Sequence, residues 1–157
     1  MTGKWILRCL LSIEAVLLCG LLLAATPEGW VMGPPEGGKT TYAVHVAFPA
    51  ADLTGVCVVK DMGDAIRGTL VNEFGAKVLD FSLRPDRRRV KLLSVASFLQ
   101  AGPVRRGIRR DLTRLFSARE SELGQEKGHR KIAVAEDGTV ELINGRWKAS
   151  YAFREIL

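Results

Sequence analysis

The sequence predicts an α+β domain in which a curved antiparallel β-sheet, a half-barrel-like meander, carries one main amphipathic helix. Short apolar segments separated by turn residues run from Thr41 to Val95, a pattern typical of an antiparallel meander. A stretch with helical periodicity follows at residues 103–116, and a second group of strands comes after it. The chain has 157 residues, 47% hydrophobic and 25% charged, which fits one ordinary globular domain.

The first 25 residues have the features of an export signal. Lys4 and Arg8 precede the apolar run CLLSIEAVLLCGLLLAA at residues 9–25, and TPEG follows it, which is the order of regions in a secretory signal. We therefore expect an exported protein, in the periplasm or associated with a membrane of the cell envelope. Cleavage of this segment, its retention as a membrane anchor and lipidation at Cys19 all remain open.

Residues 26–40 contain three of the six prolines and several glycines, a composition that does not sustain a helix or a central strand. We expect a linker here and a single β-rich globular domain over residues 41–157. If the signal is removed, Cys57 is the remaining cysteine, so we expect no intramolecular disulfide and a domain stabilised by its core.

Eight strands are expected. Five precede the helix and three follow a polar, mobile connection at residues 117–129. Asp137-Gly138 and Asn144-Gly145 separate the last three strands, and both dipeptides favour the positive φ angles of two-residue hairpin turns. The expected strands cover residues 41–48, 53–60, 65–72, 76–83, 88–95, 130–136, 139–144 and 146–153.

Residues 103–116 are expected to form the amphipathic helix. Pro103 suits the first helical position, where a backbone N–H is not needed. Arginines cover one face, and the opposite face carries apolar residues at helical spacing: Val104, Ile108, Leu112, Leu115 and Phe116.

Residues suited to catalysis or metal binding are few. His45 is expected in a strand and His129 in a polar loop, and neither a Cys-x-x-Cys nor a His-Glu-x-x-His spacing is present. A nucleophilic pair of Cys57 and His45 would require neighbouring strands to align the two side chains. We therefore expect no catalytic residue, no metal site, no cofactor and a protein that is not an enzyme.

Cations are concentrated between Arg84 and Arg114, where ten Lys and Arg stand against two Asp, in a chain of net charge +6. Such a cluster predicts a surface for an anionic partner. Export argues against nucleic acid and favours an anionic membrane surface, while an ordinary solvated helix face is the alternative. The candidate surface comprises Arg87, Arg88, Arg89, Arg105, Arg106, Arg109, Arg110 and Arg114.

Residues 53–81 resemble a group of small, uncharacterised exported bacterial proteins. The likeness rests on LTGVCVVK at residues 53–60, an Asn-Glu-Phe-Gly turn at residues 72–75, an Asp80-Phe81 strand and Asp111 on the helix. The resemblance implies no activity. We expect Gly75 to take a positive φ angle, Phe74 to anchor the turn to the core, and Asp80 and Asp111 to be solvated or paired with an arginine, which for Asp80 would be Arg67 or Arg89.

The order of elements also resembles the half-barrel of the outer-membrane lipoprotein receptor and its periplasmic carrier. In that fold a curved sheet and its helices enclose an apolar cavity for acyl chains. The resemblance implies a cavity on the concave face here, although a filled core is the alternative. The candidate cavity residues are Val56, Val58, Leu70, Leu79, Phe81, Leu92, Val134, Leu142 and Tyr151.

Together these features predict a noncatalytic envelope protein that binds a lipid, a lipoprotein or another hydrophobic or anionic envelope component. The alternative is a structural or protein-interaction module that docks through the basic helix or a sheet edge. The sequence does not predict an oligomeric state.

Overall fold

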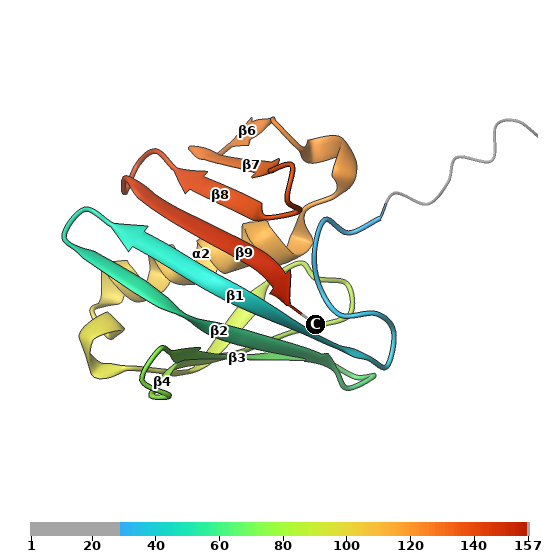
Figure 1. Cartoon of the computed structure of the whole chain (residues 1–157), viewed down its shortest axis with the longest axis horizontal. Helices are drawn as coiled ribbons and strands as arrows, with labels where there is room; N and C mark the ends of the chain where they lie inside the picture. The colour runs from blue at the N-terminus through green and yellow to red at the C-terminus, as the bar shows by residue number, and fades with distance from the viewer. Residues whose placement is uncertain (1–28, 157) are drawn as a thin grey trace, which may run out of the picture.

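The predicted fold class is confirmed by a computed structural model that describes residues 29–156. In this part of the chain one main helix packs on a nine-stranded antiparallel sheet that is open and curled (Figure 1). No helix among the described residues is long and apolar enough to cross a bilayer. The predictions of an export signal, a membrane anchor and lipidation at Cys19 concern residues 1–25, which lie outside the described residues.

The strands and the helix follow each other in the predicted order, and their ends differ from the predicted ones by at most three residues. A two-residue strand and two short 3-10 helices were not predicted. The elements are β1 (Lys39–Phe48), β2 (Ala51–Asp61), β3 (Ile66–Asn72), β4 (Lys77–Leu83), β5 (Val90–Val95), η1 (Ser97–Leu99), α2 (Gly102–Ser117), η2 (Glu120–Glu122), β6 (Glu126–Lys127), β7 (Arg130–Val134), β8 (Val140–Asn144) and β9 (Ala149–Ile156).

The sheet order is β5-β4-β3-β2-β1-β9-β8-β7-β6. Strand β1 lies at its centre and pairs with both β2 and β9, so the last strand meets the first (Figure 1). The two edges are β5 and β6, and the chain between them forms α2, which lies across the concave face against β5, β7 and β8. The helix therefore spans the opening that an incompletely closed sheet leaves.

The core lies between α2 and the concave face of the sheet. Alternate residues of the strands are buried there, because successive side chains of a strand point to opposite faces. Phe116 of α2 packs against Phe81 and Phe153, with ring centroids 5.2 and 6.2 Å apart. The predicted apolar helix face is confirmed: Ile108, Leu112, Leu115 and Phe116 are buried, and Val104 is partly buried against the same core.

The hairpin turns differ in detail from the predicted ones. Gly138 takes a positive φ of 81°, and Ala135 accepts a hydrogen bond from its N–H. The loop between β8 and β9 has four residues, 145–148, rather than a two-residue Asn-Gly turn, and Lys148 has the positive φ angle, 50°. Asn144 is buried as the last residue of β8, and its Oδ1 accepts a hydrogen bond from the N–H of Trp147.

In the Asn-Glu-Phe-Gly turn, Asn72 Oδ1 accepts hydrogen bonds from the N–H groups of Phe74 and Ala76, at 3.1 and 2.8 Å. Gly75 has the expected positive φ, 77°. The expectation that Phe74 anchors this turn to the core is wrong, because Phe74 is 85% exposed. Side-chain bonds of Asn72 to the backbone hold the turn instead.

Asp80 also has partners other than the expected arginines. Its carboxylate accepts hydrogen bonds from Thr69, Ser94 and Lys77 at 2.8 to 2.9 Å. These three partners outweigh partial burial and hold the pKa of Asp80 below its usual range.

The segment expected to be a linker, residues 26–40, packs on the domain in its described part. Met32 is 5% exposed in the core, the N–H of Val31 bonds to the carbonyl of Ala118, and β1 already begins at Lys39. The folded unit therefore begins before Thr41. Residues 35–38 form a turn in which the Gly38 N–H bonds to the carbonyl of Pro35, and the Gly37 N–H bonds to Asp61, so Pro and Gly here serve a turn that packs on the domain.

Replacing Met32 with Ala tests this packing. We expect the variant to lose about 2 to 5 kcal/mol of unfolding free energy in urea denaturation, because burial of a large apolar side chain is lost. Glu36→Ala, at an exposed position of the same segment, is the control and should change the unfolding free energy by less than about 0.5 kcal/mol. Equal, small effects of both substitutions would show that the segment does not contribute to the core.

Candidate anion-binding surface

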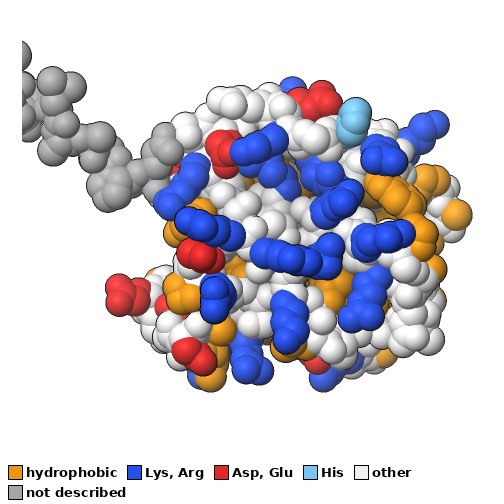
Figure 2. All heavy atoms as spheres, turned by 180° about the vertical axis from the view of Figure 1, so that it is seen from behind, with side chains coloured by type: hydrophobic (Ala, Val, Ile, Leu, Met, Phe, Trp, Pro, Cys, Tyr) orange, Lys and Arg blue, Asp and Glu red, His pale blue; other side chains and the backbone are white. Residues whose placement is uncertain are grey.

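Seven of the eight candidate arginines lie around two adjoining depressions on the helix side of the molecule. Figure 2 shows Lys and Arg side chains spread over this face. The larger depression, here called the basic groove, borders β4, β5 and the first half of α2. The smaller one, here called the Arg114 pocket, borders the second half of α2, η2, β6 and β7. Arg89 and Arg109 line both, so the two form one continuous surface.

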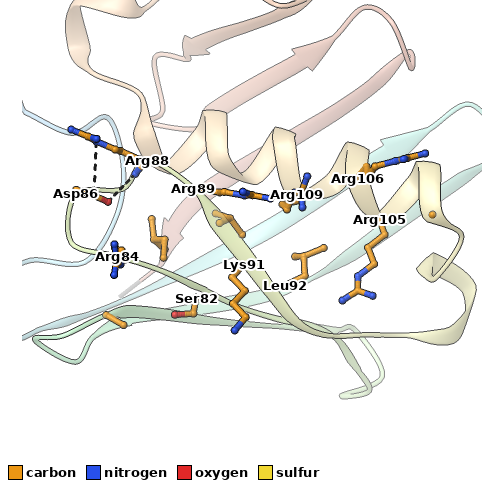
Figure 3. Close-up of a pocket in the computed structure, with 14 residues that line it drawn as sticks. Ser82, Arg84, Asp86, Arg88, Arg89, Lys91, Leu92, Arg105, Arg106 and Arg109 are labelled. Atoms are coloured by element: carbon orange, nitrogen blue, oxygen red, sulfur yellow. Dashed lines mark hydrogen bonds and ion pairs between the residues drawn. The ribbon is translucent and has the colours of Figure 1, made fainter.

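The basic groove has a volume of about 1050 Å³. Leu83, Val90 and Leu92 contribute its apolar lining, and Arg105, Arg106 and Arg109 border it from α2 (Figure 3). Sequence reasoning did not place Arg84 and Lys91 among the candidates, although both lie within the basic cluster. The charged residues that line the groove are Arg84, Asp86, Arg88, Arg89, Lys91, Arg105, Arg106 and Arg109.

The fold holds the helix alongside an edge strand to form this groove. Strand β5 has no further strand beside it, and the Oγ1 of Thr113 on α2 accepts a hydrogen bond from the N–H of Val90 at 3.0 Å. Because Ile108 and Leu112 face the core, the arginines at intervening positions face β5 and solvent. The groove is therefore a direct result of helical periodicity and of the unpaired strand edge.

Most cations of the groove have no acidic partner in the described part of the chain. Arg88 lies 3.7 Å from Asp86, whereas Arg84, Arg89, Lys91, Arg105, Arg106 and Arg109 form no ion pair with a described carboxylate. Concentrated, uncompensated charge produces a positive potential that attracts anions, and salt screens it.

The Arg114 pocket has a volume of about 390 Å³. Lys127 and Arg130 extend it beyond the predicted residues. They come from the connection and strand after the helix, whose position relative to α2 the sequence does not reveal. Its lining comprises Arg89, Arg109, Arg110, Thr113, Arg114, Ser117, Glu122, Lys127 and Arg130.

Arg114 itself is buried, with 9% of its side chain exposed. Its Nη1 forms an ion pair with Glu122 at 2.9 Å, but Nε and Nη2 are buried without a hydrogen-bond partner. An unsatisfied buried donor costs about 1 to 3 kcal/mol, so such atoms are uncommon in folded proteins and call for an explanation.

Three donors bind the carboxylate of Glu122. Its carboxylate accepts hydrogen bonds from the backbone N–H of Arg119, from Arg114 and from Lys127, at 2.9 to 3.3 Å. These contacts, the backbone bond foremost, hold the pKa of Glu122 below its usual range. It therefore stays ionised near neutral pH.

A buried polar cluster lies beneath the pocket. Asp111 of α2 is 2% exposed and accepts bonds from Arg130 Nε at 2.5 Å, Asn144 Nδ2 at 2.9 Å and Tyr151 Oη at 2.7 Å. Of the two expectations for Asp111, pairing with an arginine is therefore confirmed. Burial, and secondarily the Asp111 charge, raises the pKa of Tyr151, which keeps its hydroxyl as a donor.

Arg87 is the candidate arginine that the structure removes from the anion-binding surface. It is 6% exposed, and its Nη1 donates to the carbonyl of Met32 at 2.6 Å. Its guanidinium lies 4.8 Å from the ring centroid of Trp30, which Arg119 also contacts, at 3.3 Å. Arg87 thus fixes the N-terminal segment through a hydrogen bond and a cation–π contact.

The candidate cavity residues do not share one face. Val56 and Val58 lie on the outer face of the sheet, where Val58 is exposed. Val134 lies on the same inner face as Ile132 and its partner Val140 but is 45% exposed at the end of β7. The other six are buried beneath α2, where the helix fills the concave face: Leu70, Leu79, Phe81, Leu92, Leu142 and Tyr151. Alternation explains why Val56 and Val58 are not in the core, because on β2 they alternate with Cys57 and Val59, which are buried on the inner face.

The structure does not bring Cys57 and His45 together. Cys57 is buried on the inner face, and burial raises the pKa of its thiol to about 12, whereas His45 is exposed on the outer face, 3.8 Å from Asp52. Among residues 29–156 there is no group of three or more His, Cys, Asp or Glu side chains that could hold a metal ion.

No protein-family model matches the chain, and no curated protein is significantly similar to it. The resemblance of residues 53–81 to small exported bacterial proteins therefore stays a prediction, and so does the resemblance to the lipoprotein half-barrel.

Replacing Asp111 with Asn tests the buried cluster. We expect a loss of about 3 kcal/mol of unfolding free energy in urea denaturation, because Arg130 would be left partly buried without a charged partner. Asp86→Asn removes an exposed carboxylate and should cost less than about 0.5 kcal/mol. A loss at Asp111 no larger than at Asp86 would refute a structural role for the cluster.

Proposed function

We propose that this is a noncatalytic, exported envelope protein that binds an anionic lipid surface through the basic groove. The observation that carries the proposal is the set of exposed cations around the groove that have no described carboxylate partner. Cations near a membrane surface contribute about 1 kcal/mol each to binding of anionic lipid, so such a cluster supports stable attachment.

The groove offers apolar lipid carbons little contact surface. Leu83, Val90 and Leu92 line it but are buried, at 2%, 0% and 7% exposure. The anionic headgroup is therefore the part of a lipid that the groove cations would bind. Side chains of α2 and the sheet fill the concave face, which leaves no space there for an acyl chain. This packing favours lipid binding at the surface over enclosure of an acyl chain within the sheet.

A second candidate function is docking of an acidic protein partner. Strand β5 is a sheet edge, and exposed apolar side chains lie on and beside it, Leu93 at 45% and Phe98 at 66%. A partner could add a strand to this edge while its carboxylates meet the arginines of α2. Binding that depends on the groove cations but needs no lipid would favour this function.

Neutralising the groove tests the lipid proposal. Arg84, Lys91, Arg105 and Arg106 line the groove without lining the Arg114 pocket, and all four are exposed. We expect their joint replacement by Gln to weaken cosedimentation of the full chain with phosphatidylglycerol-containing vesicles by at least about a hundredfold, given about 1 kcal/mol per cation. Unfolding free energy should change little, since the side chains are exposed.

The matched control is joint replacement of Lys39, Lys60, Lys131 and Arg154 by Gln. These four cations are also exposed, but lie on strands away from the groove, so the net charge changes equally. The control should bind vesicles within about threefold of the wild-type chain, because nearby charges dominate at physiological salt. Equal losses in both variants, or equal binding to phosphatidylcholine vesicles, would overturn the proposal.

A further inference from the structure

We propose that the Arg114 pocket is a binding site for a single phosphoryl group. The inference deepens the proposed function and rests on it where the phosphoryl group belongs to a phospholipid headgroup. The site adjoins the basic groove, with which it shares Arg89 and Arg109, and differs from it in the buried Arg114 and in its other lining residues.

The argument begins with Arg114. A guanidinium presents its N–H groups as a planar fork that matches two oxygens of a phosphate or carboxylate. Glu122 occupies Nη1, while Nε and Nη2, which together form one side of the fork, have no partner. No described side chain satisfies these two atoms. A bidentate oxyanion would satisfy both at once, after a side-chain movement that opens them to the pocket, because both are buried in this structure.

The surroundings favour an anion of charge greater than one. Arg110 and Ser117 of α2 also line the pocket, and neither Arg110 nor Arg89 pairs with a described carboxylate. Glu122 is the acidic residue in the lining, and it is already bound by three donors. The net charge of the pocket is therefore strongly positive, which suits the near-dianionic state of a phosphate monoester at neutral pH.

The volume limits the ligand to a small group. Ligand sites typically enclose about 300 to 1,000 Å³, and the Arg114 pocket, at about 390 Å³, lies near the lower end. A phosphoryl group on a small alcohol or a lipid headgroup would fit this scale. The wider basic groove would accept the remainder of a larger ligand, because Arg89 and Arg109 connect the two.

Inorganic phosphate is the probe for a direct test. In the full chain labelled with nitrogen-15, titration with phosphate at constant ionic strength should shift the Nε–Hε signal of Arg114, with sodium chloride as the reference titration. Arg114→Lys keeps a cation for Glu122 but removes the fork, so calorimetry should show phosphate affinity reduced at least about tenfold. Arg106→Lys, a groove residue outside the pocket, should retain wild-type affinity.

Each outcome decides between the proposals. A phosphate-specific shift at Arg114, lost affinity in Arg114→Lys and unchanged affinity in Arg106→Lys support the site. Equal shifts with chloride, or equal affinities of the two variants, overturn it, and the wild-type titration alone is decisive if Arg114→Lys does not fold. Binding of anionic vesicles without a phosphate response at Arg114 would refute this site while leaving the proposed function intact. Phosphate binding without vesicle binding would establish a site for a free phosphorylated ligand and refute the lipid proposal.

Discussion

The position of α2 depends on the buried carboxylate of Asp111. Hydrophobic packing determines which face of α2 turns toward the sheet, but it constrains the position of the helix along its own axis less closely, since apolar contacts are non-directional. Asp111 adds direction, because its oxygens receive bonds from one side chain on each of β7, β8 and β9. A rotation or sliding of the helix would leave these buried donors and the carboxylate unpaired, at a cost of several kcal/mol. The cluster therefore fixes the position of α2 along its axis and reinforces the rotation that the apolar face sets.

The charge pattern of the surface follows from this placement. With Asp111, Leu112 and Leu115 turned inward, Arg105, Arg106 and Arg109 lie beside the β5 edge, and Arg110 and Arg114 lie toward η2 and β7. The same helix thus supplies cations to two adjoining depressions. The exposed cations of both depressions attract anions over a distance that salt limits, whereas the buried guanidinium of Arg114 forms its hydrogen bonds in a lower dielectric.

Local patterns in the sequence were sufficient to predict the order and approximate bounds of the strands and of the helix. Alternation and turn residues located the strands, and the spacing of Ile108, Leu112 and Leu115 located the helix and its buried face. Features that depend on contacts between distant segments were not predictable. Arg87 looks like its exposed neighbours, yet it bonds to Met32, 55 residues earlier in the chain, and Lys127 and Arg130 join the pocket only because β6 and β7 fold beside α2. Composition likewise could not distinguish a linker from a packed, turn-rich segment.

Two arginines near the same site illustrate why the pocket, rather than the groove, would select a ligand. Arg130 and Arg114 are both largely buried, and each meets a carboxylate. Arg130 also donates from Nη1 to the carbonyl of Gly128, so its demand for acceptors is largely met within the protein. Arg114 has buried donors left over beside a lining of further cations. The pairing of Arg130 is thus largely satisfied within the protein, whereas Arg114 lacks acceptors for Nε and Nη2. A phosphoryl group would supply two oxygens in the geometry that these two donors require.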